Sequence, residues 1–345
     1  MKIVYSALKY DYMDSKRRLS FEHSNFLEPL ESFANSGFIY YPYDEILNIG
    51  KKQYNKTLLE IIKKEKPDIF FAFMFTDELN FKVLDEIKKY TTSIAWFSDD
   101  HWRFDNYSKY YAPHFSWVVT TYSKAVEKYK AIGISNVIKS QWAADINTYE
   151  PVISKKDIDV SFIGSWNKER EKVIKFLERN NINVIVRGKG WKDGRIEQDE
   201  MINLISRSKI SLGLNTPSSY IGTKPFARLF FRRSGKYIIP DFWNFFGNLR
   251  EWRQKQIPQI KARIFEIPAC KTLMMTQNAD DLSNYYEDGR EIVLYQNNSD
   301  LLKNIKKLLS NDFLRNSITK RGFNRTICEH TYIKRFSEIF KFIKP

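Results

Sequence analysis

Cysteine is scarce in this sequence: the 345 residues include only Cys270 and Cys328, and no Cys-x-x-Cys pair. This usage indicates neither a disulfide framework nor a zinc site, and it fits a reducing cytoplasm. No apolar run reaches the roughly 20 residues that span a bilayer. The apolar run at the amino terminus is broken at Lys9, too soon for a signal peptide. We therefore expect a cytoplasmic protein whose contact with a membrane, if it has one, is peripheral.

Acidic residues are outnumbered, with 41 Asp and Glu against 56 Lys and Arg and a formal net charge of +15. A basic balance favours nucleic acid, anionic lipid or phosphorylated small molecules as partners. The charge is spread along the chain, and no segment has the pattern of a nucleic-acid-binding module. Two explanations stay open. One is lysine enrichment through base composition, and the other is a basic face that meets a membrane carrying a lipid-linked acceptor.

The first half of the chain alternates short apolar runs with amphipathic stretches, which predicts βαβ units and a parallel sheet. The apolar run at residues 69–75 is typical of a strand covered on both faces. Ser123 is a plausible N-cap. The predicted strands are Lys2–Ala7, Gly37–Tyr41, Asp68–Phe75, Ser93–Ser98, Trp117–Thr121 and Val137–Trp142, and the predicted helices are Phe21–Asn35, Lys52–Lys64, Asn80–Lys89 and Ser123–Ala131.

A polar, Pro-containing stretch near Asp145–Asp159 is a plausible linker, and the alternation restarts after it. Residues Thr216–Gln259 break the rhythm and are interpreted as an insertion. The later strands are expected at Asp159–Ile163, Asn183–Arg187, Lys209–Leu214, Thr272–Thr276 and Ile292–Tyr295, and the later helices at Lys168–Arg179, Gln198–Ser206, Ile260–Ala269, Ser299–Leu309, Asp312–Cys328 and Thr331–Phe342. The predicted organisation is an amino-terminal lobe at 1–150, a carboxy-terminal lobe at 151–330 that carries the insertion, and a final helix at 331–345.

One candidate site is the turn Gly164-Ser165-Trp166-Asn167 between a strand and a helix, with Arg170 in the first helical turn. A helix amino terminus offers free N–H groups and a positive dipole end, to which phosphate oxygens bind. Arg170 could add a bidentate contact. The alternative is a plain structural turn, because many such turns bind no ligand.

A second candidate is the pair Arg263 and Glu266, which share a face if the segment is helical. Glu266 could accept hydrogen bonds from a ribose diol, as acidic residues do in dinucleotide folds. Arg263 could orient that carboxylate or bind phosphate. The alternative is a surface ion pair worth a few tenths of a kcal/mol.

Six motifs occur in order in the second half of the chain: Phe162–Gly164, Gly188–Trp191, Ser208–Asn215, Lys261–Thr276, Asp288–Tyr295 and His330–Arg335. Their order and spacing resemble bacterial glycosyltransferases of the glycosyl transferases group 1 superfamily, in particular its spore-maturation-protein-like branch. The resemblance covers about half of the chain, and no single motif decides it.

This resemblance implies an α/β GT-B fold: two Rossmann-like parallel-sheet lobes facing a cleft, with the final helix crossing back to the first lobe. It implies that the second lobe binds a UDP- or GDP-sugar, that Glu266 holds the ribose and that no metal is required. Gly164 and Ser165 would face the donor phosphates, and Gly190 and Trp191 the base. Positive charge would come from Arg170, Lys224 or Arg263.

One position departs from the family pattern. Many retaining members carry a Glu eight residues before the position of Glu266, where this chain has Pro258. Asn215, Lys224 or Arg228 could substitute for it.

In the first lobe, Asp99, Asp100 and His101 follow a strand, where ligands of open α/β sheets bind. A carboxylate there could act as general base and His101 could relay a proton, whereas the structural alternative is a helix cap.

The leading hypothesis is therefore metal-independent transfer of a sugar from a nucleotide-sugar to a glycan or lipid-linked acceptor, with retention as the family tendency. A second hypothesis is a non-catalytic relative that binds a glycan or nucleotide as a surface or spore-assembly protein. The missing acidic residue at Pro258 favours this second hypothesis. A third, a nucleic-acid-binding protein, rests on charge alone.

Overall fold

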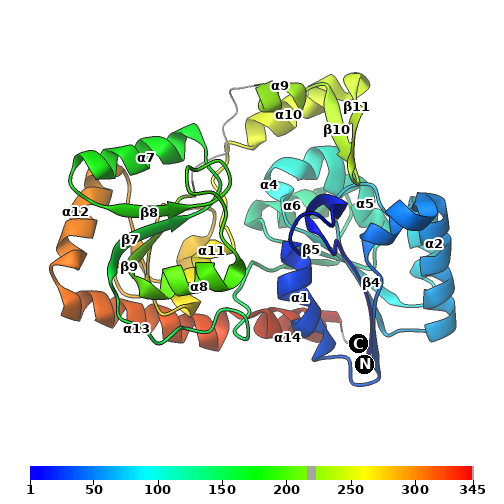
Figure 1. Ribbon diagram of the computed structural model, residues 1–345. Coiled ribbons are helices and arrows are strands. Elements are labelled where there is room, and N and C mark those ends of the chain that lie inside the picture. Colours follow the sequence, from blue (N-terminus) through cyan, green and yellow to red (C-terminus); the bar gives the residue numbers. More distant parts are fainter. Residues whose placement is uncertain (216–222, 344–345) are drawn as a thin grey trace. The chain divides into compact units, whose positions relative to one another are not determined.

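The apolar runs of the sequence form the strands of two parallel sheets (Figure 1). A computed structural model describes residues 1–215 and 223–343 of the chain, without the side chain of Lys224. The chain divides into two units. The first comprises Met1–Gln141, Tyr220–Lys255 and Arg335–Pro345, and the second comprises Trp142–Ser219 and Gln256–Lys334.

The first unit is built on a six-stranded sheet with the order β2-β1-β3-β4-β5-β6, in which all neighbours are parallel. β3 is buried along its whole length, as its apolar run predicts. The strands are β1 (Lys2–Ser6), β2 (Gly37–Tyr40), β3 (Ile69–Phe73), β4 (Thr92–Phe97), β5 (Trp117–Thr120) and β6 (Val137–Lys139). The connecting helices are α1 (Phe21–Glu31), α2 (Ile46–Glu65), α3 (Phe81–Ile87), α4 (Asp100–Arg103), α5 (Lys109–Tyr111) and α6 (Ser123–Ala131), with short turns η1 (Asp11–Met13), η2 (Tyr43–Glu45), η3 (Phe104–Ser108) and η4 (Ala112–His114).

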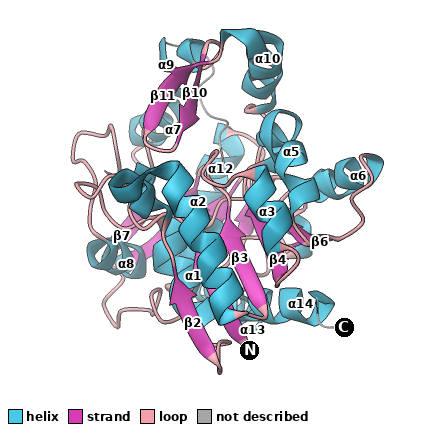
Figure 2. Ribbon diagram, turned by 90° about the vertical axis from the view of Figure 1, so that its right-hand side faces the viewer, coloured by secondary structure: helices cyan, strands magenta, loops and turns pink. Residues whose placement is uncertain are grey.

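Helices cover both faces of this sheet, as parallel strands require. On one face, apolar side chains of α2, α3 and α6 pack against β3, β4 and β5 (Figure 2). On the other face, Phe26 of α1 lies 5.0 Å from Trp96 and 5.2 Å from Phe336, measured between ring centroids. Phe336 belongs to α14 (Tyr332–Ile343), so the carboxy-terminal helix helps to cover this face. This agrees with the predicted crossover of the final helix.

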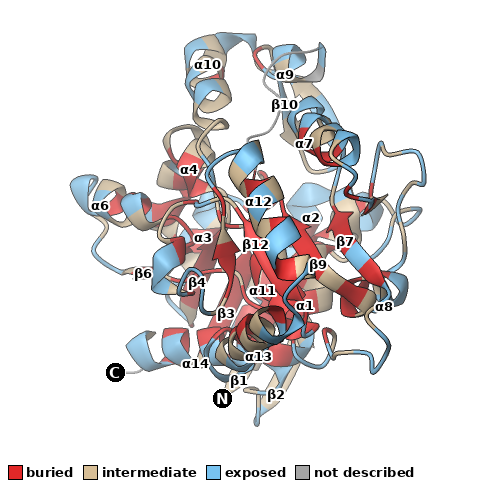
Figure 3. Cartoon of the chain, turned by 90° about the vertical axis from the view of Figure 1, so that its left-hand side faces the viewer, coloured by how far each residue is buried: buried red, intermediate tan, exposed pale blue. Residues whose placement is uncertain are grey.

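The second unit contains a five-stranded parallel sheet with the order β13-β12-β9-β7-β8, and Figure 3 shows β7, β9 and β12 largely buried. Helices α7 and α12 pack on one face, and α8 and α11 on the other. The strands are β7 (Ile158–Ile163), β8 (Val184–Arg187), β9 (Ser208–Gly213), β12 (Leu273–Thr276) and β13 (Val293–Leu294). The helices are α7 (Lys168–Arg179), α8 (Gln198–Arg207), α11 (Arg263–Ala269), α12 (Asn298–Leu309) and α13 (Asp312–Glu329), with the turn η6 (Leu282–Asn284). Asn167, Asn297 and Asn311 cap α7, α12 and α13.

Local expectations fail at a few places. Ser123 is not the N-cap of α6: Tyr122 holds that position and makes no side-chain cap bond. The stretch expected as a linker belongs to the second unit, where Tyr149 is buried and residues 152–155 are exposed. Ala144, just before the stretch, pairs with Thr331 of the same unit. The unit boundary therefore lies at Gln141 and Trp142 rather than near residue 150.

The insertion is the largest difference from the predicted organisation. Residues 223–255 of it group with the first unit, whereas residues 256–259 group with the second unit, in which the sequence places the whole insertion. Residues 223–255 form α9 (Thr223–Ala227), the antiparallel pair β10 (Phe231–Ser234) and β11 (Tyr237–Pro240), η5 (Phe242–Asn244) and α10 (Phe245–Gln254). Residues 216–222 lie outside the described residues. Polar side chains such as Asn248 form long-range bonds that local sequence patterns do not encode.

Glu22, at the start of α1, carries a buried carboxyl group. Burial raises its pKa to about 8, and the nearby carboxylates of Asp11, Asp44 and Glu78 act in the same direction, while its own backbone N–H opposes them. The folded state therefore holds a proton on this group that the unfolded chain releases above the ordinary pKa of 4.5.

We expect the free energy of unfolding to fall as pH rises from about 4.5 to about 8, by up to about 1.4 kcal/mol per pH unit from this group alone. Glu22→Gln should flatten that dependence, because the amide does not titrate. Urea denaturation at pH 5, 6.5 and 8 measures it, and Glu28→Gln, an exposed position of the same helix, is the control. A wild-type stability that is flat or rising over this range contradicts the assignment.

Candidate functional site

The second sheet has a topological switch point between β7 and β9. The chain leaves β7 toward β8 on one side, whereas β9 and then β12 lie on the other side. Ligands of open α/β sheets bind outside the carboxyl ends of the strands at such a point. The loops that follow β7 and β9 begin there with Gly164 and Leu214, so the predicted residues Gly164, Ser165 and Asn215 share this edge.

Arg170 joins these two loops. Its guanidinium donates to the carbonyl oxygen of Ser165 at 2.7 Å and to that of Leu214 at 3.1 Å. It also lies 5.5 Å from the ring centroid of Phe162, and burial lowers the pKa of Arg170 from its ordinary value. The phosphate contact of Arg170 stays a prediction. The observed hydrogen bonds show that Arg170 connects the loops after β7 and β9 across the switch point, and we call this connection a clamp.

Glycine residues let two loops approach each other closely at the same edge of the sheet. Gly188 has φ +140°, and a Cβ added there would lie 2.1 Å from the carbonyl oxygen of Gly164. The loops after β7 and β8 therefore approach closely only because residue 188 has no side chain. The indole N–H of Trp191 donates to the same carbonyl oxygen at 2.9 Å. Gly190 and Trp191 thus lie beside Gly164, and their predicted contact with a base stays a prediction.

Asn215 fixes the end of β9 to its neighbour. Its side chain is buried and donates to the hydroxyl of Thr276 at 3.0 Å and to the carbonyl oxygen of Gln277 at 3.2 Å. The Thr276 hydroxyl in turn donates to the carbonyl oxygen of Gly213. The residue proposed as a donor contact therefore also holds β9 and β12 together at their carboxyl ends.

Glu266 is buried in the first turn of α11, between a cation and a phenol. Its carboxylate lies 2.6 Å from the guanidinium of Arg263 and accepts a hydrogen bond from Tyr149. Burial, and then the Glu266 charge, raise the pKa of Tyr149 well above its ordinary value. Because the side chain of Glu266 is only 3% exposed, the pair is not the surface ion pair that the sequence left open as an alternative.

The start of α11 lies at the same sheet edge as the switch point. A helix that returns the chain between parallel strands begins at their carboxyl ends. Consistently, a Cβ added to Gly213 at the end of β9 would lie 3.1 Å from Ile264. The topology thus gathers Gly164, Asn215 and Glu266 along one edge of one unit. The side chain of Lys224 lies outside the described part of the chain.

The amino-terminal cluster is mostly internal. Asp100 is fully buried, accepts a hydrogen bond from Tyr129 at 2.9 Å, and has its pKa raised to about 6 by burial. His101 is also buried, edge-on to Tyr122. Asp99 is partly exposed at the N-cap position of α4, without the side-chain cap bond that the structural alternative requires. The catalytic roles stay predictions, and Asp99 is the member of the cluster that solvent reaches.

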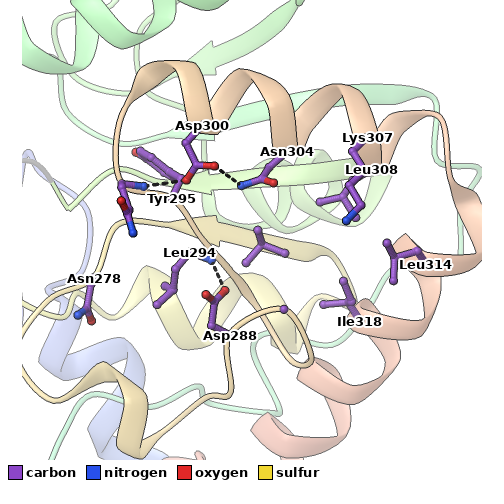
Figure 4. A pocket seen from close by; sticks show the side chains of 13 residues that line it. Asn278, Asp288, Leu294, Tyr295, Asp300, Asn304, Lys307, Leu308, Leu314 and Ile318 are labelled. Atoms are coloured by element: carbon purple, nitrogen blue, oxygen red, sulfur yellow. Dashed lines mark hydrogen bonds between the residues drawn. The ribbon is translucent and has the colours of Figure 1, made fainter.

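A cavity of about 610 Å³ lies elsewhere in the second unit, between the end of β13, α12 and α13 (Figure 4). Asp288 accepts the backbone N–H of Leu294 in its wall, and Asp300 accepts that of Gln296. None of the predicted site residues lines this cavity. These two carboxylates bind the backbone at the end of β13 and just after it.

Within residues 1–215 and 223–343, no group of three or more His, Cys, Asp or Glu side chains is placed to hold a metal ion. Among the helices described there, none combines the length and apolar character needed to cross a bilayer.

Comparison with solved structures gives the fold. HepE from Anabaena, in complex with UDP-glucose, matches at a TM-score of 0.60 and 10% identity, over 99% of this chain and 98% of that one. The chain has the GT-B fold. Sucrose-phosphate synthase from Thermosynechococcus elongatus matches at 0.56 and 9% identity, over 99% and 98%. The lipopolysaccharide outer core galactosyltransferase WaaB matches at 0.55 and 13%, over 99% of each chain.

Comparison of sequences supports the resemblance over a shorter part of the chain than comparison of structures does. Residues 242–341 match the family model described as glycosyl transferase-like, which confirms the broader resemblance over that segment. None of the curated protein sequences matches the chain. The spore-maturation-protein-like branch stays a prediction.

Sequence reasoning missed two features of this GT-B site. Tyr149 partners Glu266 from a segment interpreted as a linker, and Arg170 spans two loops rather than one. Both contacts join residues distant in the chain, so no local signal marks them. The glycine pattern Gly188-x-Gly190 was the available hint of close backbone approach.

Gly188→Ala should destabilise the second unit more than Gly194→Ala. Both residues have positive φ, but φ +140° at Gly188 costs an L-residue more than φ +68° at Gly194, and a Cβ at Gly194 meets no atom within 4 Å. The difference therefore combines backbone strain at residue 188 with the clash against Gly164. We expect an extra loss of about 1–3 kcal/mol. Urea midpoints of the two variants measure it, and equal midpoints would show that the loops are not packed as described.

Proposed function

We propose that this chain transfers a sugar from a nucleotide-sugar donor to a glycan or lipid-linked acceptor. The GT-B fold and the glycosyl transferase-like match over residues 242–341 support this activity. The observation that carries the proposal is Glu266: it lies inside the matched segment and at the sheet edge where a GT-B donor lobe is expected to bind nucleotide.

We infer that Glu266 binds the ribose diol of the donor. A carboxylate has about four lone-pair sites, and Arg263 and Tyr149 are the partners found within the protein. The remaining acceptor capacity suits two hydroxyl donors. The partners also fix the carboxylate rotamer, which lowers the entropy lost when the diol binds.

We further propose that no metal is needed to stabilise the leaving diphosphate. The twelve-residue helix α7 begins beside Gly164 and Ser165, so its positive end faces the expected phosphate position. Arg263 adds a fixed cation near the same edge.

In the first unit, Asp99 is the candidate to bind an acceptor hydroxyl or take its proton. Retention follows from the family resemblance.

A second candidate is a non-catalytic GT-B relative that binds nucleotide or glycan. Pro258, in the segment between α10 and α11, stands where many retaining relatives carry an acidic residue. A site without that carboxylate could bind a donor and not turn it over.

Nucleotide binding tests the site itself. UDP or GDP should raise the unfolding temperature more than ADP or CMP, because a ligand that binds only the folded state stabilises it, by about 2.7 kcal/mol at a hundred times its Kd. Glu266→Gln should weaken that binding roughly tenfold or more, through loss of a charged acceptor. Calorimetric titration at a temperature where both proteins are folded measures the affinity.

Glu287→Gln is the matched control, since Glu287 is an exposed carboxylate of the same unit, paired with Arg290. It should bind nucleotide like the wild type. The donor-site assignment fails if no nucleotide stabilises the wild type, or if Glu266→Gln binds as tightly as the control.

Measuring catalytic turnover distinguishes the glycosyltransferase from the non-catalytic relative. The transferase should release UDP or GDP from a nucleotide-sugar in the presence of EDTA, and Asp99→Asn should slow transfer to an acceptor by about 10²–10⁴-fold if Asp99 is the general base. Nuclear magnetic resonance of the product gives the anomeric configuration. Nucleotide binding with no transfer or hydrolysis would support the non-catalytic candidate.

A further inference from the structure

The helix α10 of the insertion has two opposite faces. Asn244, Asn248 and Glu251 are spaced for one face, and all three hydrogen-bond Asn106 of the first unit. Lys255 continues this face, with its ammonium group 3.9 Å from the ring centroid of Trp102. This face therefore fixes α10 to the segment that follows β4.

The outward face holds large aromatic side chains. Trp243 is 101% exposed and Phe246 is 82% exposed, and Arg250 and Arg253 follow on the same face at helical spacing. Burying such side chains in a core would stabilise the fold, yet within the described chain they are left in solvent. An exposed apolar patch of this kind marks a binding surface.

The hairpin of the insertion adds to this exposed apolar surface. Tyr237 and Ile238 on β11 are 66% and 68% exposed. We use the term insertion surface for six exposed side chains of the insertion: Tyr237, Ile238, Trp243, Phe246, Arg250 and Arg253.

The charge of the insertion points to an anionic partner. Residues 223–255 contain eight Lys and Arg and two carboxylates, a net charge of +6. Both carboxylates are engaged: Asp241 lies 3.7 Å from Arg232, and Glu251 lies 2.9 Å from Lys255. Aromatic side chains interleaved with Arg and Lys are the composition of elements that lie in the interface of an anionic bilayer.

The insertion is also tied to the edge where the first unit would bind an acceptor. The backbone N–H of Gly235 donates to the Thr76 hydroxyl at 2.8 Å, and the Ser234 hydroxyl donates to Asp77 at 2.7 Å. Thr76 and Asp77 follow β3, which with β1 forms the switch point of the six-stranded sheet. A bilayer held by the insertion would therefore lie near the carboxyl ends of these strands.

We propose that the insertion surface docks on an anionic lipid bilayer and so brings the headgroup of a lipid-linked acceptor to the carboxyl edge of the six-stranded sheet. The docking stands on the residues above, whereas the delivery of an acceptor rests on the proposed glycosyl transfer.

Vesicle sedimentation with the full chain tests the docking. Wild type should bind vesicles of phosphatidylcholine with 30 mol% phosphatidylglycerol, about tenfold or more tighter than phosphatidylcholine alone, and less at high salt. Trp243→Ser with Phe246→Ser should weaken binding about tenfold or more. Arg250→Gln with Arg253→Gln should weaken it about fivefold per arginine.

Matched controls remove equivalent side chains from the second unit. Ile153→Ser with Phe313→Ser deletes similarly exposed apolar groups, and Lys303→Gln with Lys306→Gln deletes two exposed charges. Both should bind vesicles like the wild type. The proposal is overturned if wild type ignores anionic vesicles, if the controls lose as much as the test variants, or if light scattering shows a dimer that Trp243→Ser with Phe246→Ser dissociates.

Nucleotide-induced thermal shifts on the same proteins separate this proposal from the proposed function. The Trp243 and Phe246 double variant should keep the wild-type shift, which also shows that it is folded. Vesicle binding without any nucleotide shift would leave the docking standing and remove the transferase, and the reverse result would remove the docking alone.

Discussion

The candidate site depends on the clamp that Arg170 forms across the switch point of the second sheet. Its guanidinium binds the carbonyl oxygens of Ser165 and Leu214, so the loops after β7 and β9 are held at a fixed distance. An arginine suits this task, because its planar fork can satisfy two acceptors at once. On the other side of β7, Gly188 lets the loop after β8 contact Gly164 directly. Three loops therefore form one surface, which a ligand could contact without prior rearrangement.

The second constraint is the cost of burying a carboxyl group, and the protein offsets that cost in two ways. Glu266 is compensated by a cation and a phenol, which keeps its carboxylate in a fixed place inside the second unit. Glu22 has no such cation among its main influences, and burial instead raises its pKa to about 8. The first arrangement fixes the position of an acceptor side chain, whereas the second links the stability of the first unit to pH.

The insertion shows how one segment can serve two environments. Amide and carboxylate side chains of the insertion hydrogen-bond Asn106, whereas the Ser234 hydroxyl and the Gly235 backbone N–H donate to Asp77 and Thr76. The insertion is therefore attached by specific polar contacts rather than by a large apolar core. Its outer aromatic and basic side chains stay in solvent. Polar attachment leaves the apolar groups of the insertion available for a partner, which links its packing to the proposed docking.

The sequence by itself determined the order of most strands and helices outside the insertion and the segment between β4 and β5, because local runs such as Ile69–Phe73 and Lys168–Arg179 carry the patterns of two-sided burial and helical spacing. It also marked Gly164, Arg263 and Glu266 as a candidate site through their spacing and the family resemblance. Only the tertiary structure decided that Arg170 clamps two loops, that Tyr149 partners Glu266, and that residues 223–255 of the insertion belong to the first unit. Each of these depends on contacts between residues far apart in the chain, and such contacts follow from how the layers pack rather than from any local pattern.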